Sequence, residues 1–121
     1  MKHSFINDKR VYAPTCKSDL LDLISDYKGV LIALNAEKLL KKDARLKTII
    51  NQNIGYPDGV GAVWALKRKG LETIKIPGVE LWLSILEKFK ATKSLYIIGG
   101  KEAVINSTIS KIKVLYPELS I

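Results

Sequence analysis

The sequence predicts a layered α/β domain with a mainly parallel sheet, and three observations lead to this fold class. Two continuous apolar runs of strand length, residues 29–34 and 94–98, are typical of strands covered on both faces. Stretches with helical periodicity alternate with these runs, as expected of strand–helix–strand connections. A length of 121 residues, with 47% hydrophobic and 26% charged residues, fits one globular domain over residues 1–121.

The start of the chain has the pattern of a β-hairpin followed by a helix. Residues 3–13 contain two short strand-like runs with an Asn7-Asp8 turn between them. Thr15 or Ser18 is expected to cap the helix that follows, and Gly29 ends this segment. The apolar face of this helix is expected to consist of Leu20, Leu23, Ile24 and Tyr27.

The segment after the first apolar run is the most basic part of the chain. Asn35 stands where the run ends and a short helix begins, and Asp43 is expected to start the next helix. Such a basic run is usually the solvated face of a helix, and a binding patch is the alternative. The basic residues are Lys38, Lys41, Lys42, Arg45 and Lys47.

Asp58 is the first candidate for chemistry. A short strand is expected to reach Tyr56, where Pro57 interrupts a paired ladder and Asp58-Gly59 turns the chain into a helix. The carboxyl ends of parallel strands are where α/β proteins bind ligands. Spacing alone favours a simpler role for Asp58, as the residue that caps this helix.

The C-terminal third predicts a long amphipathic helix, the strand at residues 94–98, and a final helix. Trp64 and Trp82 both fit the core faces of helices, so we expect them to pack inside and not to stack on bases. Gly99-Gly100 precedes the final helix. Two roles are compatible with this pattern, the binding of a phosphate and the formation of a tight turn alone. The final helix is expected to turn five residues inward: Ile105, Thr108, Ile109, Ile112 and Leu115.

Charge and composition narrow the classes of partner. A net charge of +8 favours anionic partners in general. The single histidine, His3, has no second histidine or cysteine near it, which argues against a metal site. The single cysteine, Cys16, cannot form an internal disulfide, and no run of about 18 apolar residues occurs. These features predict a cytoplasmic protein without a resident metal.

Five blocks of sequence occur in an order and spacing that resemble the WecB/TagA/CpsF family of bacterial glycosyltransferases. No single block is specific, but together they extend over nearly the whole chain. The blocks are Leu34-Asn35-Ala36-Glu37, Tyr56-Pro57-Asp58-Gly59-Val60-Gly61-Ala62-Val63-Trp64, Ile76-Pro77-Gly78-Val79-Glu80-Leu81, Ile97-Ile98-Gly99-Gly100-Lys101 and Tyr116-Pro117-Glu118-Leu119.

The resemblance implies a Rossmann-like fold and an inverting glycosyltransferase that needs no metal. The donor would be a UDP-sugar carrying N-acetylmannosamine or its uronic acid. The acceptor would be polyprenyl-diphosphate-linked N-acetylglucosamine, in the synthesis of teichoic acid, common antigen or capsule. The resemblance also implies a peripheral location at the inner face of the cell membrane, no other cofactor, and no nucleic-acid partner. The sequence contains no Asp-x-Asp motif.

The same resemblance assigns roles to individual residues. Asp58 would be the general base that takes the proton of the acceptor hydroxyl. Ala33 stands where the family commonly has a threonine. Lys75 stands where the family often has an arginine, and it would offset diphosphate charge without the bidentate fork of arginine. The implied substrate-binding residues are Asn35, Lys75 and Gly78, and the implied nucleotide-binding residues are Gly99 and Gly100.

The sequence lacks the later Gly-x-Pro-x-Gln-Glu block and the C-terminal appendage that family members use in membrane docking. We therefore expect the chain to correspond to the N-terminal part of a longer glycosyltransferase fold. A homo-oligomer or a partner chain would supply the missing half. The alternative is a truncated, non-catalytic remnant or subunit that binds UDP-sugar or a partner chain. A basic nucleic-acid-binding domain is disfavoured, because the sequence has no aromatic stacking stripe.

Overall fold

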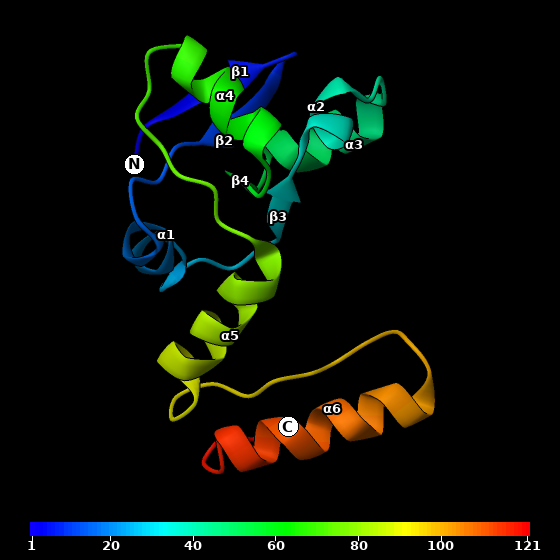
Figure 1. Cartoon of the computed structure of the whole chain (residues 1–121). Coiled ribbons are helices and arrows are strands. Elements are labelled where there is room, and N and C mark those ends of the chain that lie inside the picture. Colours follow the sequence, from blue (N-terminus) through cyan, green and yellow to red (C-terminus); the bar gives the residue numbers. More distant parts are fainter. The chain divides into compact units, whose positions relative to one another are not determined.

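The computed structural model describes residues 1–121 and divides into two compact units, Met1–Leu81 and Trp82–Ile121 (Figure 1). The predicted α/β class is confirmed, with an N-terminal hairpin and a parallel strand pair. That residues 1–121 form a single domain of a longer fold stays a prediction. None of the helices combines the length and the apolar character that a membrane span requires. The elements are β1 (His3–Ile6), β2 (Lys9–Tyr12), α1 (Lys17–Ile24), β3 (Leu31–Leu34), α2 (Ala36–Leu40), α3 (Ala44–Asn51), β4 (Ile54–Pro57), α4 (Val60–Arg68), α5 (Gly78–Phe89) and α6 (Glu102–Leu115).

The first unit contains two small sheets. Strands β1 and β2 pair antiparallel around Asn7 and Asp8, whose positive φ angles of 48° and 65° suit the tight hairpin turn predicted there. Strands β3 and β4 pair in parallel, and Leu34 at the end of β3 lies opposite Pro57 at the end of β4. This register brings the carboxyl ends of the two strands to one edge of the sheet.

The core of the first unit lies between the strands and helices α2, α3 and α4. The hairpin lies beside both β4 and α3, and the backbone N–H of Arg10 in β2 donates to Asn51 Oδ1 at the end of α3 at 2.8 Å. Asp43 caps α3 as expected, since its Oδ1 accepts hydrogen bonds from the backbone N–H groups of Arg45 and Leu46. The buried members of the core are Val11, Ala13, Leu34, Leu39, Ile50, Ala62 and Leu66.

The prediction of a buried strand at residues 94–98 is wrong. The segment forms one isolated parallel bridge, between Ser94 and Ser120. Leu95 and Ile97 are half-buried, whereas Tyr96 and Ile98 are each 85% exposed. A strand covered on both faces needs a paired neighbour and a layer on each side, and the second unit covers only one side of this segment.

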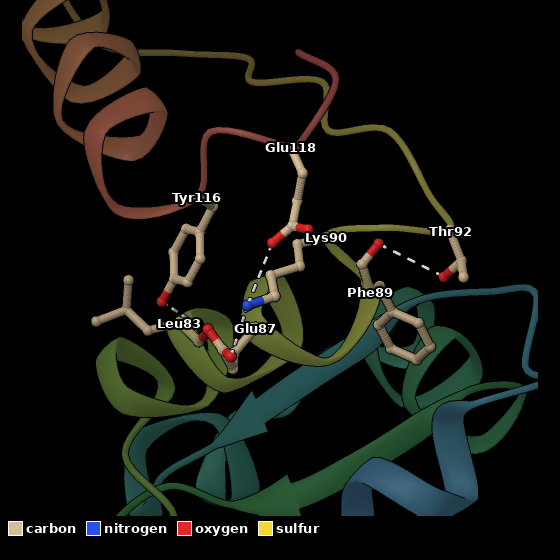
Figure 2. Close-up of polar contacts among 7 residues, drawn as sticks. All are labelled: Leu83, Glu87, Phe89, Lys90, Thr92, Tyr116 and Glu118. Atoms are coloured by element: carbon tan, nitrogen blue, oxygen red, sulfur yellow. Dashed lines mark hydrogen bonds and ion pairs between the residues drawn. The ribbon is translucent and has the colours of Figure 1, made fainter.

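The second unit has its own small core between α5, α6 and the segment that joins them. Leu86, Ile112 and Leu119 are buried there. Figure 2 shows the polar contacts at its surface, where Lys90 Nζ lies 2.9 Å from Glu87 Oε1 and 3.3 Å from Glu118 Oε1. The hydrogen bonds to Glu87 and then Glu118 raise the pKa of Lys90.

Three further expectations about side chains are wrong. Trp64 is 67% exposed and Trp82 is 38% exposed, so neither tryptophan packs inside a core as expected. Leu115, expected to face inward from α6, is 62% exposed. Neither Thr15 nor Ser18 caps α1; Cys16 is the N-cap residue and contributes no side-chain hydrogen bond. The Thr15 hydroxyl donates instead to Asp19 Oδ2 at 2.6 Å, and this bond lowers the pKa of Asp19.

Candidate active site

Asn35 lies at the carboxyl end of β3 and begins α2. Its backbone is extended, and its side-chain Oδ1 accepts a hydrogen bond of 3.0 Å from the backbone N–H of Lys38. Asn35 is therefore the N-cap of α2, a position for which asparagine is among the preferred residues. Because the cap uses Oδ1, the amide nitrogen is not required for the cap and can donate to another group.

Asp58 lies at the carboxyl end of β4, but it does not cap the helix that follows. The N-cap of α4 is Gly59, and α4 has no side-chain cap. The prediction that Asp58 caps this helix is therefore wrong. Asp58 Oδ1 instead accepts a hydrogen bond of 2.7 Å from the backbone N–H of Gly78, the first residue of α5. The first N–H groups of a helix have no partner within the helix, and a carboxylate there also meets the favourable end of the helix dipole.

Asn35 and Asp58 leave the sheet side by side. The preceding residues, Leu34 and Pro57, are paired in register, and the backbone N–H of Asp58 donates to the Leu34 carbonyl at 3.0 Å. A Cβ placed on Gly59 would lie 3.6 Å from the Cβ of Asn35. The tertiary fold thus brings a carboxylate and an amide, 23 positions apart in the sequence, to one edge of the sheet.

Tyr56 is a further member of this cluster, and the sequence patterns alone did not indicate it. Its side chain is buried, and burial together with the negative charge of Asp58 raises the pKa of Tyr56 to about 12. The phenol therefore stays neutral and able to donate a hydrogen bond at physiological pH. A signal for it exists in the sequence, because Asp58 directly follows β4, and side chains two positions apart along an extended chain, such as those of Tyr56 and Asp58, face the same side.

Gly78 closes the cluster from the start of α5. A Cβ at this position would lie 3.1 Å from Tyr56 Oη and 3.9 Å from both Asp58 Oδ1 and the Ala33 Cβ. The absence of a side chain is therefore what allows the helix start to approach both polar groups. Ala33, which stands where the family commonly has a threonine, therefore also lies next to Gly78.

Lys75 precedes the cluster on the segment that passes the end of β4. The backbone N–H of its neighbour Ile76 donates to the Pro57 carbonyl at 2.9 Å, and Ile76 is buried. Lys75 itself is exposed. Its role in offsetting diphosphate charge stays a prediction.

Gly99 and Gly100 belong to the second unit and form the turn that precedes α6. Their φ angles are +105° and +77°, a region that side chains other than glycine rarely adopt. The turn alone accounts for the presence of both glycines. Their predicted role in nucleotide binding stays a prediction.

Asp58, Asn35 and Tyr56 together offer a proton acceptor, an amide and a neutral hydroxyl. A carboxylate next to hydrogen-bonding groups that orient a hydroxyl substrate is suited to general base catalysis. No group of three or more His, Cys, Asp or Glu side chains is placed to hold a metal ion. Metal-independent chemistry stays a prediction.

The model of the glycosyl transferase WecG/TagA/CpsF family matches residues 9–121. The match covers nearly the whole chain, so the chain belongs to this family, and the resemblance indicated by the five sequence blocks is confirmed. The protein is therefore a glycosyltransferase by family, which indicates a nucleotide-sugar donor, a lipid-linked acceptor and cell envelope biosynthesis in general terms.

Proposed function

We propose that this member of the WecG/TagA/CpsF family transfers N-acetylmannosamine, or its uronic acid, from a UDP donor to polyprenyl-diphosphate-linked N-acetylglucosamine. The product would enter a cell-surface polysaccharide such as teichoic acid or capsule. The observation that carries the proposal is the Asp58 carboxylate at the carboxyl ends of β3 and β4, beside Asn35. The location proposed with it is the cytoplasmic face of the membrane, where the lipid-linked acceptor is embedded.

In the proposed reaction, Asp58 acts as general base. It takes the proton of the acceptor hydroxyl as that oxygen forms a bond to the anomeric carbon of the donor sugar. The bond between this carbon and the UDP oxygen breaks, UDP leaves with the electron pair, and the anomeric configuration inverts. Because Gly78 engages Oδ1, the proton goes to Oδ2.

Asn35, Tyr56 and Lys75 have supporting roles in this proposal. The Asn35 amide nitrogen and the neutral Tyr56 hydroxyl are suited to orienting sugar hydroxyls next to Asp58. Lys75, exposed on the adjoining segment, offsets charge on the UDP leaving group in place of a metal ion. Gly99 and Gly100 are proposed to approach the nucleotide.

A turnover assay tests the proposal. The protein is incubated with UDP-N-acetylmannosamine and a short-chain polyprenyl-diphosphate N-acetylglucosamine acceptor, and UDP release and the disaccharide lipid are measured with and without EDTA. Transfer that survives the chelator supports the proposal, whereas transfer abolished by EDTA and restored by a divalent cation contradicts metal independence. Calorimetric titration with UDP-sugar runs alongside. Binding without product would instead assign the chain to a non-catalytic subunit or remnant.

A further inference from the structure

The α2–α3 connection and the turn between β1 and β2 enclose a basic cavity of about 530 Å³. Four lysines line it, namely Lys9, Lys41, Lys42 and Lys47. Asp8 and Asp43 also line the cavity, so positive charge remains in excess. The Asp43 carboxylate is already occupied, because it caps the start of α3.

Lys9 fixes the shape of this cavity from inside. Its side chain is only 4% exposed, and its Nζ donates to the backbone carbonyls of Leu39 at 3.0 Å and Lys41 at 2.8 Å. Asn7 Nδ2 adds a hydrogen bond of 3.2 Å to the Leu39 carbonyl. The hairpin turn therefore holds the last carbonyls of α2, where a positive charge is also favourable to the helix dipole.

Leu40 projects an apolar side chain among the surrounding lysines. It is 69% exposed, and Lys41, Lys42 and Lys47 are exposed as well. An exposed apolar group among lysines suits the boundary of a bilayer, where the apolar group enters the acyl region and ammonium groups meet lipid phosphates. None of the residues that line the cavity is aromatic, and single-stranded nucleic acid would require such groups for stacking.

We propose that Leu40, Lys41, Lys42 and Lys47, which we call the basic tip, dock on the surface of a bilayer that contains anionic lipids. This inference rests on the proposed function, because an acceptor embedded in a membrane requires the site to come close to the lipid headgroups. Helix α2, five residues long, separates Leu40 from Asn35 by only about 8 Å at 1.5 Å per residue. Docking through the basic tip thus brings the sheet edge with Asn35 and Asp58 toward the headgroups.

Co-sedimentation with vesicles tests the docking surface. One set of vesicles contains phosphatidylcholine alone, and the other contains phosphatidylcholine and phosphatidylglycerol in equal parts. We expect binding to the second set only. The triple variant Lys41→Gln, Lys42→Gln, Lys47→Gln should lower the partition coefficient roughly 100-fold, because each lysine near an anionic bilayer contributes about 1 kcal/mol to binding. Leu40→Ser should lower it about tenfold.

A second basic cluster provides the matched control. Lys67, Arg68 and Lys69 are also exposed and lie at the end of α4. Changing all three to Gln removes the same charge and should alter the partition coefficient by less than about threefold. Equal losses in both triple variants, or equal binding to both sets of vesicles, would overturn the proposal. Circular dichroism checks that each variant is folded. If a triple variant is unfolded, the test rests on Leu40→Ser, which changes one exposed side chain, and unchanged vesicle binding by this variant would overturn the proposal.

Two outcomes separate this proposal from its alternatives. Salt-dependent binding to a DNA duplex, combined with no binding to vesicles, would assign the basic tip to nucleic acid and overturn membrane docking. The vesicles contain neither donor nor acceptor, so failure to bind them leaves the proposed transfer untouched. Conversely, an enzyme that docks but transfers no sugar refutes the proposed function alone.

Discussion

The carboxylate of Asp58 accepts a hydrogen bond of 2.7 Å from the backbone N–H of Gly78, 20 positions further along the chain. This bond joins the end of β4 to the start of α5. It also shows that Asp58 caps a helix, but not the one that follows it in sequence. Because one oxygen serves the fold, substitutions at this position can separate structure from chemistry.

We predict that Asp58→Asn abolishes most sugar transfer while the fold survives. The asparagine oxygen still accepts the Gly78 N–H, but an amide cannot take a proton from the acceptor hydroxyl. Turnover should fall by roughly 100- to 10,000-fold, the usual contribution of a general base. Rates of UDP release and thermal unfolding of the same preparation provide the measurement. Near-normal turnover would remove Asp58 from the role of base.

Asn35→Ser and Asn35→Ala should separate the two roles of Asn35, as N-cap of α2 and as an amide that binds the sugar substrates. Serine is as good an N-cap as asparagine, so Asn35→Ser should leave the stability nearly unchanged, whereas Asn35→Ala should cost about 1 kcal/mol. Both remove the amide and should raise the KM for the sugar substrates. Urea unfolding and steady-state kinetics measure the two effects. A wild-type KM in Asn35→Ser would show that the side chain serves only α2.

Gly78→Ala should destabilise the protein by about 1–3 kcal/mol, because the new methyl group meets the hydroxyl of buried Tyr56 at about 3.1 Å. Removing that hydroxyl relieves the contact. In a Tyr56→Phe background, Gly78→Ala should therefore leave the free energy of unfolding nearly unchanged. The double-mutant cycle should then give a non-zero interaction free energy between the two positions. Additive losses measured by urea unfolding would place the strain elsewhere.

Tyr56 should titrate well above the usual range of a tyrosine side chain. The pKa of Tyr56 is raised from 10.0 to about 12, first by burial and then by Asp58. Ultraviolet absorbance of the phenolate should show this late transition, and Asp58→Asn should lower its pKa only in part because burial remains. Since the folded pKa of Tyr56 is the higher one, its contribution to stability is fully present below pH 10 and is lost as the pH rises toward 12. The absence of a phenolate transition near pH 12 would contradict this assignment.

Lys9→Met should destabilise the protein by about 1–3 kcal/mol. The change leaves the Lys41 carbonyl without the bond from Lys9 Nζ, and the Leu39 carbonyl keeps only Asn7. The exposed Lys42→Met is the control and should change stability by less than about 0.5 kcal/mol. Unchanged unfolding of Lys9→Met would show that the cost of burying the ammonium cancels these bonds.

Most local elements follow from the sequence because their signals are local. Asn7-Asp8 form the predicted turn, and Asp43 caps the predicted helix through N–H groups two and three residues away. The five family blocks likewise identify the family correctly. The predicted strand at residues 94–98 is wrong because strand formation depends on a distant partner and not on a local signal. Apolar composition shows that a segment suits a strand, but pairing requires a neighbour that composition does not specify.

The sequence alone determined the order of strands and helices outside residues 94–98, the family, and the selection of Asp58 and Asn35 as candidates, because these depend on residue type and near neighbours. Only the tertiary structure decided which partner each side chain meets. Pairing Leu34 with Pro57 places Asn35 beside Asp58, and the start of α5 brings Gly78 against Tyr56 and Asp58. Such contacts join positions 20 or more residues apart, and they depend on how whole elements pack, which residue spacing within one element does not encode.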